Sequence, residues 1–303
     1  MGGEAGLPIE WIDRRWKPLL TLFWVGAAAR FVWERWAQIS GFGLGDTDDN
    51  LRMMQVRALL EGQGWYDLRQ HRLNPPSGAD IHWSRLVDLP IAGIKLALAP
   101  LLGGRSAETV AVTLAPMLPM LVAMASLAVV VRRLVDPKAW PVALALLLCA
   151  ASARGMWAPL RLDHHGWQLA MLALALAALT DPRRARGGAL LGAATAGSFA
   201  IGLEMLLYFA LAGAVTVLRW ILDREQAKRL FAYGVALGGG CALAFLVFAS
   251  EANRAPVCDA LSPVWLSAMV LAGALCVALA LSRFAHARWR VAAPGAGGAG
   301  PAP

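Results

Sequence analysis

Long apolar runs, separated by short basic or polar clusters, dominate the hydrophobic pattern of the chain. Runs near 20 residues match the hydrocarbon thickness of a bilayer, and in lipid they must be helical because every backbone polar group needs an internal partner. The pattern predicts an all-α fold, a polytopic transmembrane bundle of about eight spans. The predicted spans are residues 18–38, 109–131, 139–154, 166–180, 188–203, 205–222, 230–249 and 263–282.

The composition is that of a membrane protein. Hydrophobic residues make up 58% of the chain and the mean hydropathy is +0.54, whereas soluble domains are roughly 45–50% apolar. We expect residues 1–291 to form one transmembrane domain, with the first span as a retained anchor because no small-residue cleavage site follows it. Residues 292–303 are Gly, Ala and Pro only, which predicts a disordered tail.

Basic clusters give the orientation of the predicted spans. The positive-inside rule places them in the cytoplasm with both termini, which leaves a first external loop (39–108) and a second (155–165) outside a bacterial-type inner membrane. The clusters account for the net charge of +8 beside anionic lipid, so we expect no nucleic-acid partner. They comprise Arg14, Arg15 and Lys17; Arg132, Arg133 and Lys138; Arg183, Arg184 and Arg186; Arg219, Arg224, Lys228 and Arg229; and Arg283, Arg288 and Arg290.

The first external loop opens with a dense group of acids. Asp46, Asp48 and Asp49 precede a predicted helix that ends near Gly62. Carboxylates this close repel one another unless an arginine or a metal ion neutralises them, and Mg²⁺ and Mn²⁺ accept oxygen ligands. The alternative is helix capping, in which these acids accept hydrogen bonds from the first amides and favour the helix dipole.

A second candidate cluster, Asp163-His164-His165, follows Arg161 in the second external loop. Asp163 and His165 are two positions apart, so an extended turn would point both side chains at one metal ion. Glu204, between two spans, is a further candidate because ionisable groups at membrane depth are usually functional. The alternative is a hairpin that lets Glu204 reach interfacial water.

The rest of the first external loop alternates aromatic and basic residues. His82 and Arg85 are candidates for phosphate binding, and Trp83 for stacking on a sugar. The apolar segment 88–102 carries Lys95 and is predicted to be a helix at the outer interface, capped by Asp88. The alternative is anchoring at the membrane interface by aromatic side chains, namely Trp65, Tyr66 and Trp83.

Three segments together resemble a known family. The pattern Asp46, Asn50, Arg52 is similar to the first acidic motif of the oligosaccharyltransferase catalytic subunit and of the wider membrane glycosyltransferase C superfamily. Asp163-His164-His165 resembles the archaeal form of the second acidic motif, and residues 74–90 resemble the Pro-rich, Trp-containing end of the first external loop. The resemblance covers about residues 18–180, roughly the N-terminal half.

The resemblance implies a divalent metal, Mg²⁺ or Mn²⁺, held by Asp46, Asp163 and His165, at an outward-facing site for a polyprenyl-phosphate-linked sugar. Asp48 and Asp49 stand where the oligosaccharyltransferase motif has aromatic residues, and the chain has no Trp-Trp-Asp-Tyr-Gly motif for reading a protein sequon. We therefore expect inverting sugar transfer to an envelope lipid or glycan in preference to a protein acceptor.

These observations define two sets of site residues and a competing hypothesis. The catalytic set is Asp46, Asp48, Asp49 and Glu204, and the substrate-binding set is Arg52, His82, Trp83, Arg85, Arg161 and His164. The arginines are expected to make charge-assisted bonds to phosphate. The competing hypothesis is a non-enzymatic protein: a transporter, an assembly subunit or a shortened inactive relative. A transporter would carry polar residues at mid-membrane, whereas the acids here collect at the outer ends of the spans.

Overall fold

The computed structural model describes residues 7–282, whose regular structure is helical apart from one two-stranded hairpin. The predicted all-α class is confirmed, and the predicted tail at 292–303 lies outside the described residues. The α-helices are α1 (Leu7–Arg14), α2 (Trp16–Glu34), α3 (Trp36–Ser40), α4 (Thr47–Leu60), α5 (Arg85–Leu102), α6 (Gly104–Leu114), α7 (Met117–Leu134), α8 (Trp140–Cys149), α9 (Ala151–Gly155), α10 (His165–Leu179), α11 (Arg184–Ile201), α12 (Leu206–Leu222), α13 (Ala227–Phe248) and α14 (Pro263–Leu281). The strands are β1 (Arg69–Gln70) and β2 (Ala79–Asp80), and two 3₁₀ turns are η1 (Arg224–Gln226) and η2 (Ala252–Arg254).

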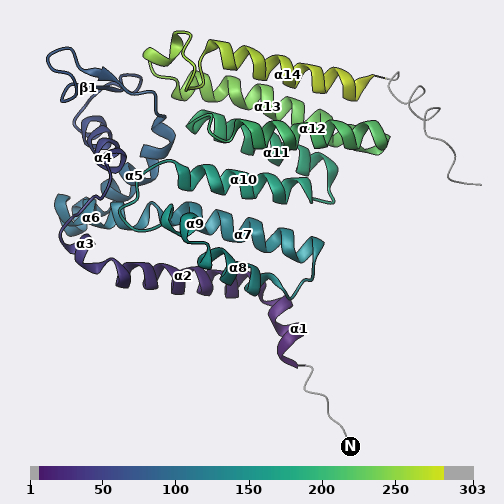
Figure 1. Ribbon diagram of the computed structural model, residues 1–303, viewed down its shortest axis with the longest axis horizontal. Coiled ribbons are helices and arrows are strands. Elements are labelled where there is room, and N and C mark those ends of the chain that lie inside the picture. Colours follow the sequence, from purple (N-terminus) through teal and green to yellow (C-terminus); the bar gives the residue numbers. More distant parts are fainter. Residues whose placement is uncertain (1–6, 283–303) are drawn as a thin grey trace, which may run out of the picture.

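The long helices lie side by side in a flat stack (Figure 1). In that view they run in the order α2, α7, α10, α11, α13 and α14, and α10 contacts both α7 and α11. One apolar core, with Phe31, Met124 and Trp140, joins α2, α7 and α8. Another, with Phe209 and Tyr233, joins α10 to α14. Since α10 contributes to both cores, it connects the two halves of the stack.

Three helical segments are long and apolar enough to cross a membrane: Gly104–Leu134, Arg224–Phe248 and Pro263–Leu281. They are consistent with a membrane protein, but within residues 7–282 they are fewer than the predicted eight or so spans. Other predicted spans are short or interrupted. The first predicted span, 18–38, is interrupted because α2 ends at Glu34, which forms an ion pair with Arg30. The third, 139–154, is broken at Ala150, where the backbone leaves the helical conformation with ψ 94°. The shorter apolar helices are α8, α10 and α12.

Small residues allow α11 and α13 to pack closely. A Cβ atom added to Gly188 would lie 2.0 Å from the carbonyl oxygen of Arg229, and one added to Gly192 would lie 2.6 Å from Cβ of Ala236. Backbones can approach this closely only where side chains are absent, as in many membrane helix pairs. These glycines therefore fix the position of α11, whose last turn leads to Glu204.

The segment predicted to be the first external loop, residues 39–108, includes α4, the hairpin and α5 at one end of the stack (Figure 1). The predicted helix is confirmed as α4, but it begins earlier than expected, so that Asp46 is its N-cap and Asp48 and Asp49 lie in its first turn. The chain turns at Gly62 with φ +104°. Segment 88–102 is helical as predicted, within α5. The predicted cap is wrong: Ser84 caps α5 by accepting from the Leu86 amide, whereas Asp88 lies buried one turn later.

The same loop is tied to the distant end of α13. Trp65 Nε1 donates to the Val247 carbonyl at 2.6 Å, and the Tyr66 hydroxyl donates to the Leu246 carbonyl at 3.1 Å. Asn253 Nδ2 donates to the His82 carbonyl at 2.9 Å. These bonds hold the loop across the end of the stack, so that α4 faces the start of α10.

Candidate metal and acid site

The acids at the start of α4 have different partners. Asp46 caps the helix by accepting from the Asp48 amide at 3.0 Å, which confirms the capping interpretation for this residue. Asp49 instead accepts from the amides of Leu162 and Asp163, at 2.7 and 3.1 Å. Burial raises the pKa of the Asp49 carboxyl above its usual value, although these amides and Arg161 oppose the shift. Asp49 therefore binds the second acidic segment through backbone groups.

Arg161 joins the two acidic segments. Its guanidinium donates to Asp46, which lies 115 positions away, to Asp49 at 3.4 Å and to Asp163 at 3.1 Å. The Asp48 amide and the Arg161 guanidinium hold the pKa of Asp46 below its usual value. Mutual repulsion among these carboxylates is thus relieved by an arginine, one of the two neutralising groups expected from the sequence.

Asp163, His164 and His165 form a compact group of possible metal ligands at the start of α10. Each offers one ligand atom, and these atoms lie within 4.8 Å of one another. Asp163 Oδ1 is 2.8 Å from His164 Nδ1, Asp163 Oδ2 contacts His165 Nδ1, and the two imidazoles stack with centroids 4.6 Å apart. Burial raises the pKa of Asp163, but the bonds to both histidines outweigh it and hold the pKa well below its usual value.

The ligand group differs from the set predicted from the sequence. Asp46 is not part of the group, because its carboxylate binds Arg161, and His164 stands in its place. His164 Nδ1 is buried, and its one polar neighbour among the described residues is Asp163 Oδ1 at 2.8 Å. A buried imidazole nitrogen beside a carboxylate oxygen offers two ligand atoms of the types that bind transition metals.

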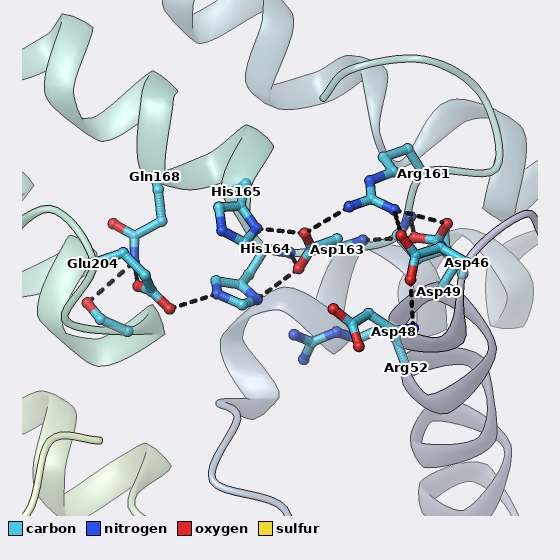
Figure 2. A network of polar contacts seen from close by, with 12 residues as sticks. Asp46, Asp48, Asp49, Arg52, Arg161, Asp163, His164, His165, Gln168 and Glu204 are labelled. Atoms are coloured by element: carbon cyan, nitrogen blue, oxygen red, sulfur yellow. Dashed lines mark hydrogen bonds and ion pairs between the residues drawn. The ribbon is translucent and has the colours of Figure 1, made fainter. Parts of the chain in front are cut away.

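Glu204 holds the other nitrogen of His164. Its Oε1 lies 2.8 Å from His164 Nε2, and Gln168 donates to Oε2 at 2.7 Å. Gln168 also donates to the Gly202 carbonyl, and its Oε1 accepts from the Ser198 hydroxyl. Figure 2 shows the resulting network from Gln168 and Glu204 through the histidines and Asp163 to Arg161 and Asp46. Gln168 and Ser198 were not predicted, although isolated polar residues in apolar helices are a recognisable signal.

The carboxylates of Asp163 and Glu204 also determine the pKa of His164. Burial lowers the pKa of its imidazole, but the adjacent Asp163 and Glu204 carboxylates raise it further and bring the pKa above the usual value. For Glu204, burial raises the pKa and the hydrogen bond to His164 lowers it, with a net decrease. A positive charge near His164, from a proton or a metal ion, is therefore stabilised from two sides.

Three of the predicted substrate-binding residues form a buried platform below this network. Arg52 and Arg85 bind the two oxygens of Asp88 at 3.0 and 3.3 Å, and all three side chains are fully buried. The Arg52 guanidinium lies 4.5 Å from the ring centroid of Trp83, which is also buried, and Trp83 contacts His164 at 6.0 Å between centroids. This geometry favours structural support over direct contact with phosphate or sugar.

His82 lies apart from the platform. Its side chain is partly exposed, and Nδ1 is 3.7 Å from a carboxylate oxygen of Asp259 in the segment before α14. Its predicted phosphate contact stays a prediction.

No protein-family model matches the chain, and comparisons with curated proteins and with solved structures also find no match. The resemblance to membrane glycosyltransferases therefore rests on the short motifs at Asp46–Arg52, Asn74–Pro90 and Asp163–His165.

Proposed function

We propose that the protein is a metal-dependent, inverting glycosyltransferase of the membrane C type. It transfers a sugar from a polyprenyl-phosphate carrier to a hydroxyl of an envelope lipid or glycan, on the outer face of a bacterial inner membrane. The observation that carries the proposal is the joining of Asp46 and Asp49, through Arg161, to the Asp163-His164-His165 group at one end of an apolar helical stack.

The donor atoms and local charge fit a divalent cation. Asp46, Asp49, Asp163 and Glu204 outnumber the fixed cation, Arg161, so the network retains negative charge. A carboxylate with two imidazoles suits Mn²⁺ better than Mg²⁺, which prefers oxygen ligands. When bound, the metal would stabilise the negative charge that develops on the departing phosphate.

Asp48 is the best placed general base. Its side chain is partly exposed and forms no salt bridge with any residue in 7–282, whereas Asp46 and Asp49 are bound to Arg161. In the proposed step, Asp48 accepts the proton of the acceptor hydroxyl while the hydroxyl oxygen bonds to C1 of the sugar. The C1–O bond to phosphate breaks, and its electron pair leaves with the phosphate.

Arg161 and Glu204 have supporting roles in this proposal. The Arg161 side chain remains 23% exposed, so it can bind the departing phosphate as well as orient Asp163. Glu204 was predicted as catalytic, but its bonds make it a positioning residue that fixes the His164 ring. Asp49 positions the backbone at Leu162 and Asp163.

The proposal retains a topology of about eight spans with the site outside. The two ends of α10 support the orientation, although not the number of spans. Its first residue belongs to the ligand group, while just beyond its last turn Asp181 binds Arg186 at 2.7 Å and contacts Arg133 at 3.7 Å. The acidic site and these basic clusters therefore lie at opposite ends of one apolar helix. Under the positive-inside rule, the basic end is cytoplasmic.

One observation favours a second candidate, a non-enzymatic assembly subunit. The ion pairs of Arg161 with Asp46, Asp49 and Asp163 would also brace two loops without any chemistry. Turnover assays distinguish the two functions.

The test is sugar transfer by the purified protein from synthetic polyprenyl-phosphate sugars in the presence of Mn²⁺ or Mg²⁺. We expect chelator to abolish transfer and Asp163→Asn to reduce it about 100-fold or more, as expected when transition-state charge stabilisation is lost. Glu251→Gln, which removes an exposed acid from the turn after α13, is the matched control and should retain transfer. Transfer that withstands chelator and Asp163→Asn would exclude the metal mechanism, and no transfer with any donor would favour the assembly subunit.

A further inference from the structure

A separate groove lies between α4 and the segment that follows β1. Its volume is about 350 Å³, and its walls include Met54 and Arg57 from α4, Glu61 just after α4, and Gln70, His71 and Arg72 from the hairpin. Nothing in the reaction proposed above uses these residues. All of these residues belong to the predicted first external loop. The groove is open on one side.

The groove uses a different face of α4 from the acid site. Asp49, Arg52 and Val56 are buried on the inner face, while Met54, Arg57 and Glu61 follow one another at helical spacing on a partly exposed face. A ligand in the groove would therefore not contact the metal group. It would contact the helix that positions Asp46 and Asp49.

The groove carries an excess of positive charge even with Glu61 on its wall. Arg57 shares the Glu108 carboxylate with Lys95, so two cations face one acid. Arg72 contacts the Met54 sulfur at 3.9 Å but no carboxylate within residues 7–282. An arginine without a carboxylate partner on a groove wall is a strong donor for an anion.

Gln70 provides an independent sign of a missing acceptor. The residue is only 5% exposed, and its amide nitrogen, Nε2, is buried without a hydrogen-bond partner in the described residues. Buried polar groups are rarely left unpaired, and each exception needs an explanation. Because Gln70 also lines the groove, a rotation of its side chain would bring this amide to an acceptor oxygen supplied by a ligand there.

We propose that this groove binds a phosphate group through the Arg72 guanidinium and the Gln70 amide, with His71 and Arg57 beside it. Several N–H donors from a guanidinium and an amide suit the oxygens of phosphate. The phosphate belongs either to a lipid headgroup or to a free phosphate species. The proposal does not rest on glycosyl transfer, since it concerns binding at a separate face of α4.

Equilibrium dialysis of radiolabelled inorganic phosphate against the full chain in a neutral detergent tests the free species. Native mass spectrometry of the protein in nanodiscs of neutral lipid, with or without phosphatidylglycerol, tests the lipid headgroup. In at least one arm we expect saturable binding that weakens about tenfold or more in Arg72→Gln, as for loss of a charged hydrogen bond. Gln70→Leu should also weaken binding without lowering the unfolding temperature, because it removes an unpaired buried amide.

Arg105→Gln is the matched control, because Arg105 is exposed on α6, outside the groove, and its loss changes net charge equally. We expect Arg105→Gln to bind as wild type does. Binding in neither arm would overturn the proposal. It would also be overturned if Arg105→Gln weakened binding as much as Arg72→Gln, since the effect would then be one of net charge alone. Binding confined to the phosphatidylglycerol arm and lost in Arg72→Gln would support the proposal with a lipid headgroup as the source.

Discussion

The Nε2 atom of His164 lies 2.8 Å from Oε1 of Glu204, which places a carboxylate from the turn before α12 directly behind a ring at the start of α10. A carboxylate in this position fixes the ring orientation and strengthens imidazole as a metal ligand. Gln168 donates to the other carboxylate oxygen at 2.7 Å, so both oxygens of Glu204 are held.

Glu204→Ala should reduce both the affinity for Mn²⁺ and the rate of sugar transfer about 10- to 100-fold, as expected when the residue behind a metal ligand is lost. The measurement is the transfer rate as a function of Mn²⁺ concentration. Glu204→Gln keeps an oxygen that can accept from His164 and should recover part of the loss. Equal losses in the two variants, with unchanged dependence on Mn²⁺, would contradict a positioning role.

Asp48→Asn should lower kcat about 100-fold while changing KM little, because general-base catalysis contributes roughly 10²–10⁴-fold to the rate. Asparagine has nearly the same shape but cannot accept the proton. Steady-state kinetics with a fixed polyprenyl-phosphate sugar provides the values, and Glu251→Gln is the control. A change in KM alone would assign Asp48 to substrate binding instead.

Asp88→Ala should lower the free energy of unfolding by about 3–5 kcal/mol, because it would leave the fully buried guanidinium groups of Arg52 and Arg85 without their shared carboxylate. Asp80→Ala is the comparison, since it removes an exposed partner of Arg69 and should cost no more than about 1 kcal/mol. Unfolding in detergent, followed by circular dichroism, measures both. Similar losses for the two variants would show that the platform is not a stabilising unit.

Asp181 predicts a specific dependence of stability on pH. Burial raises the pKa of its carboxyl, but the bonds from Arg186 and the Arg183 amide outweigh this and hold the pKa below the usual aspartate value. A depressed folded-state pKa gives stability above the unfolded pKa, about 3.9, that is lost as pH falls through the lower folded value.

Wild type should therefore unfold at a higher temperature than Asp181→Asn at pH 6, and the difference should shrink below about pH 4. The measurement is the unfolding temperature of both proteins from about pH 3 to about pH 7, a range that includes the pKa of aspartate in the unfolded chain. Asp136→Asn, an exposed aspartate in the turn after α7, should show little difference from wild type. A difference for Asp181→Asn that grows as pH falls would contradict the prediction.

The parts of the structure that were predicted correctly depend on local signals. Asp46 before Thr47 and the glycine at position 62 define the ends of α4 within the sequence itself. Ser84 gave an equally local signal for the start of α5, but Asp88 was taken as the cap. Its burial between two arginines is a tertiary effect that local propensity does not report.

The remaining differences come from contacts between distant segments. Nothing near Asp46 in the sequence identifies Arg161 as its partner, because the two residues are brought together only by packing of the loop against α10. Hydrophobicity likewise predicted a continuous helix over 139–154, whereas the chain leaves the helical conformation at Ala150 with no proline or glycine at that position to mark it. The sequence predicted Asp46 as the third ligand, whereas the structure has His164 in that place, and this difference follows from the same tertiary arrangement.

The most direct test of the metal site is pulsed electron paramagnetic resonance of Mn²⁺ added to the purified protein. Because Asp163, His164 and His165 lie within ligand distance of one another, we expect one bound Mn²⁺ whose echo is modulated by histidine ¹⁴N nuclei. The nitrogen modulation should decrease in His165→Ala, and binding should be lost in Asp163→Asn. Absence of bound Mn²⁺, or an ion without nitrogen ligands that persists in both variants, would contradict the account.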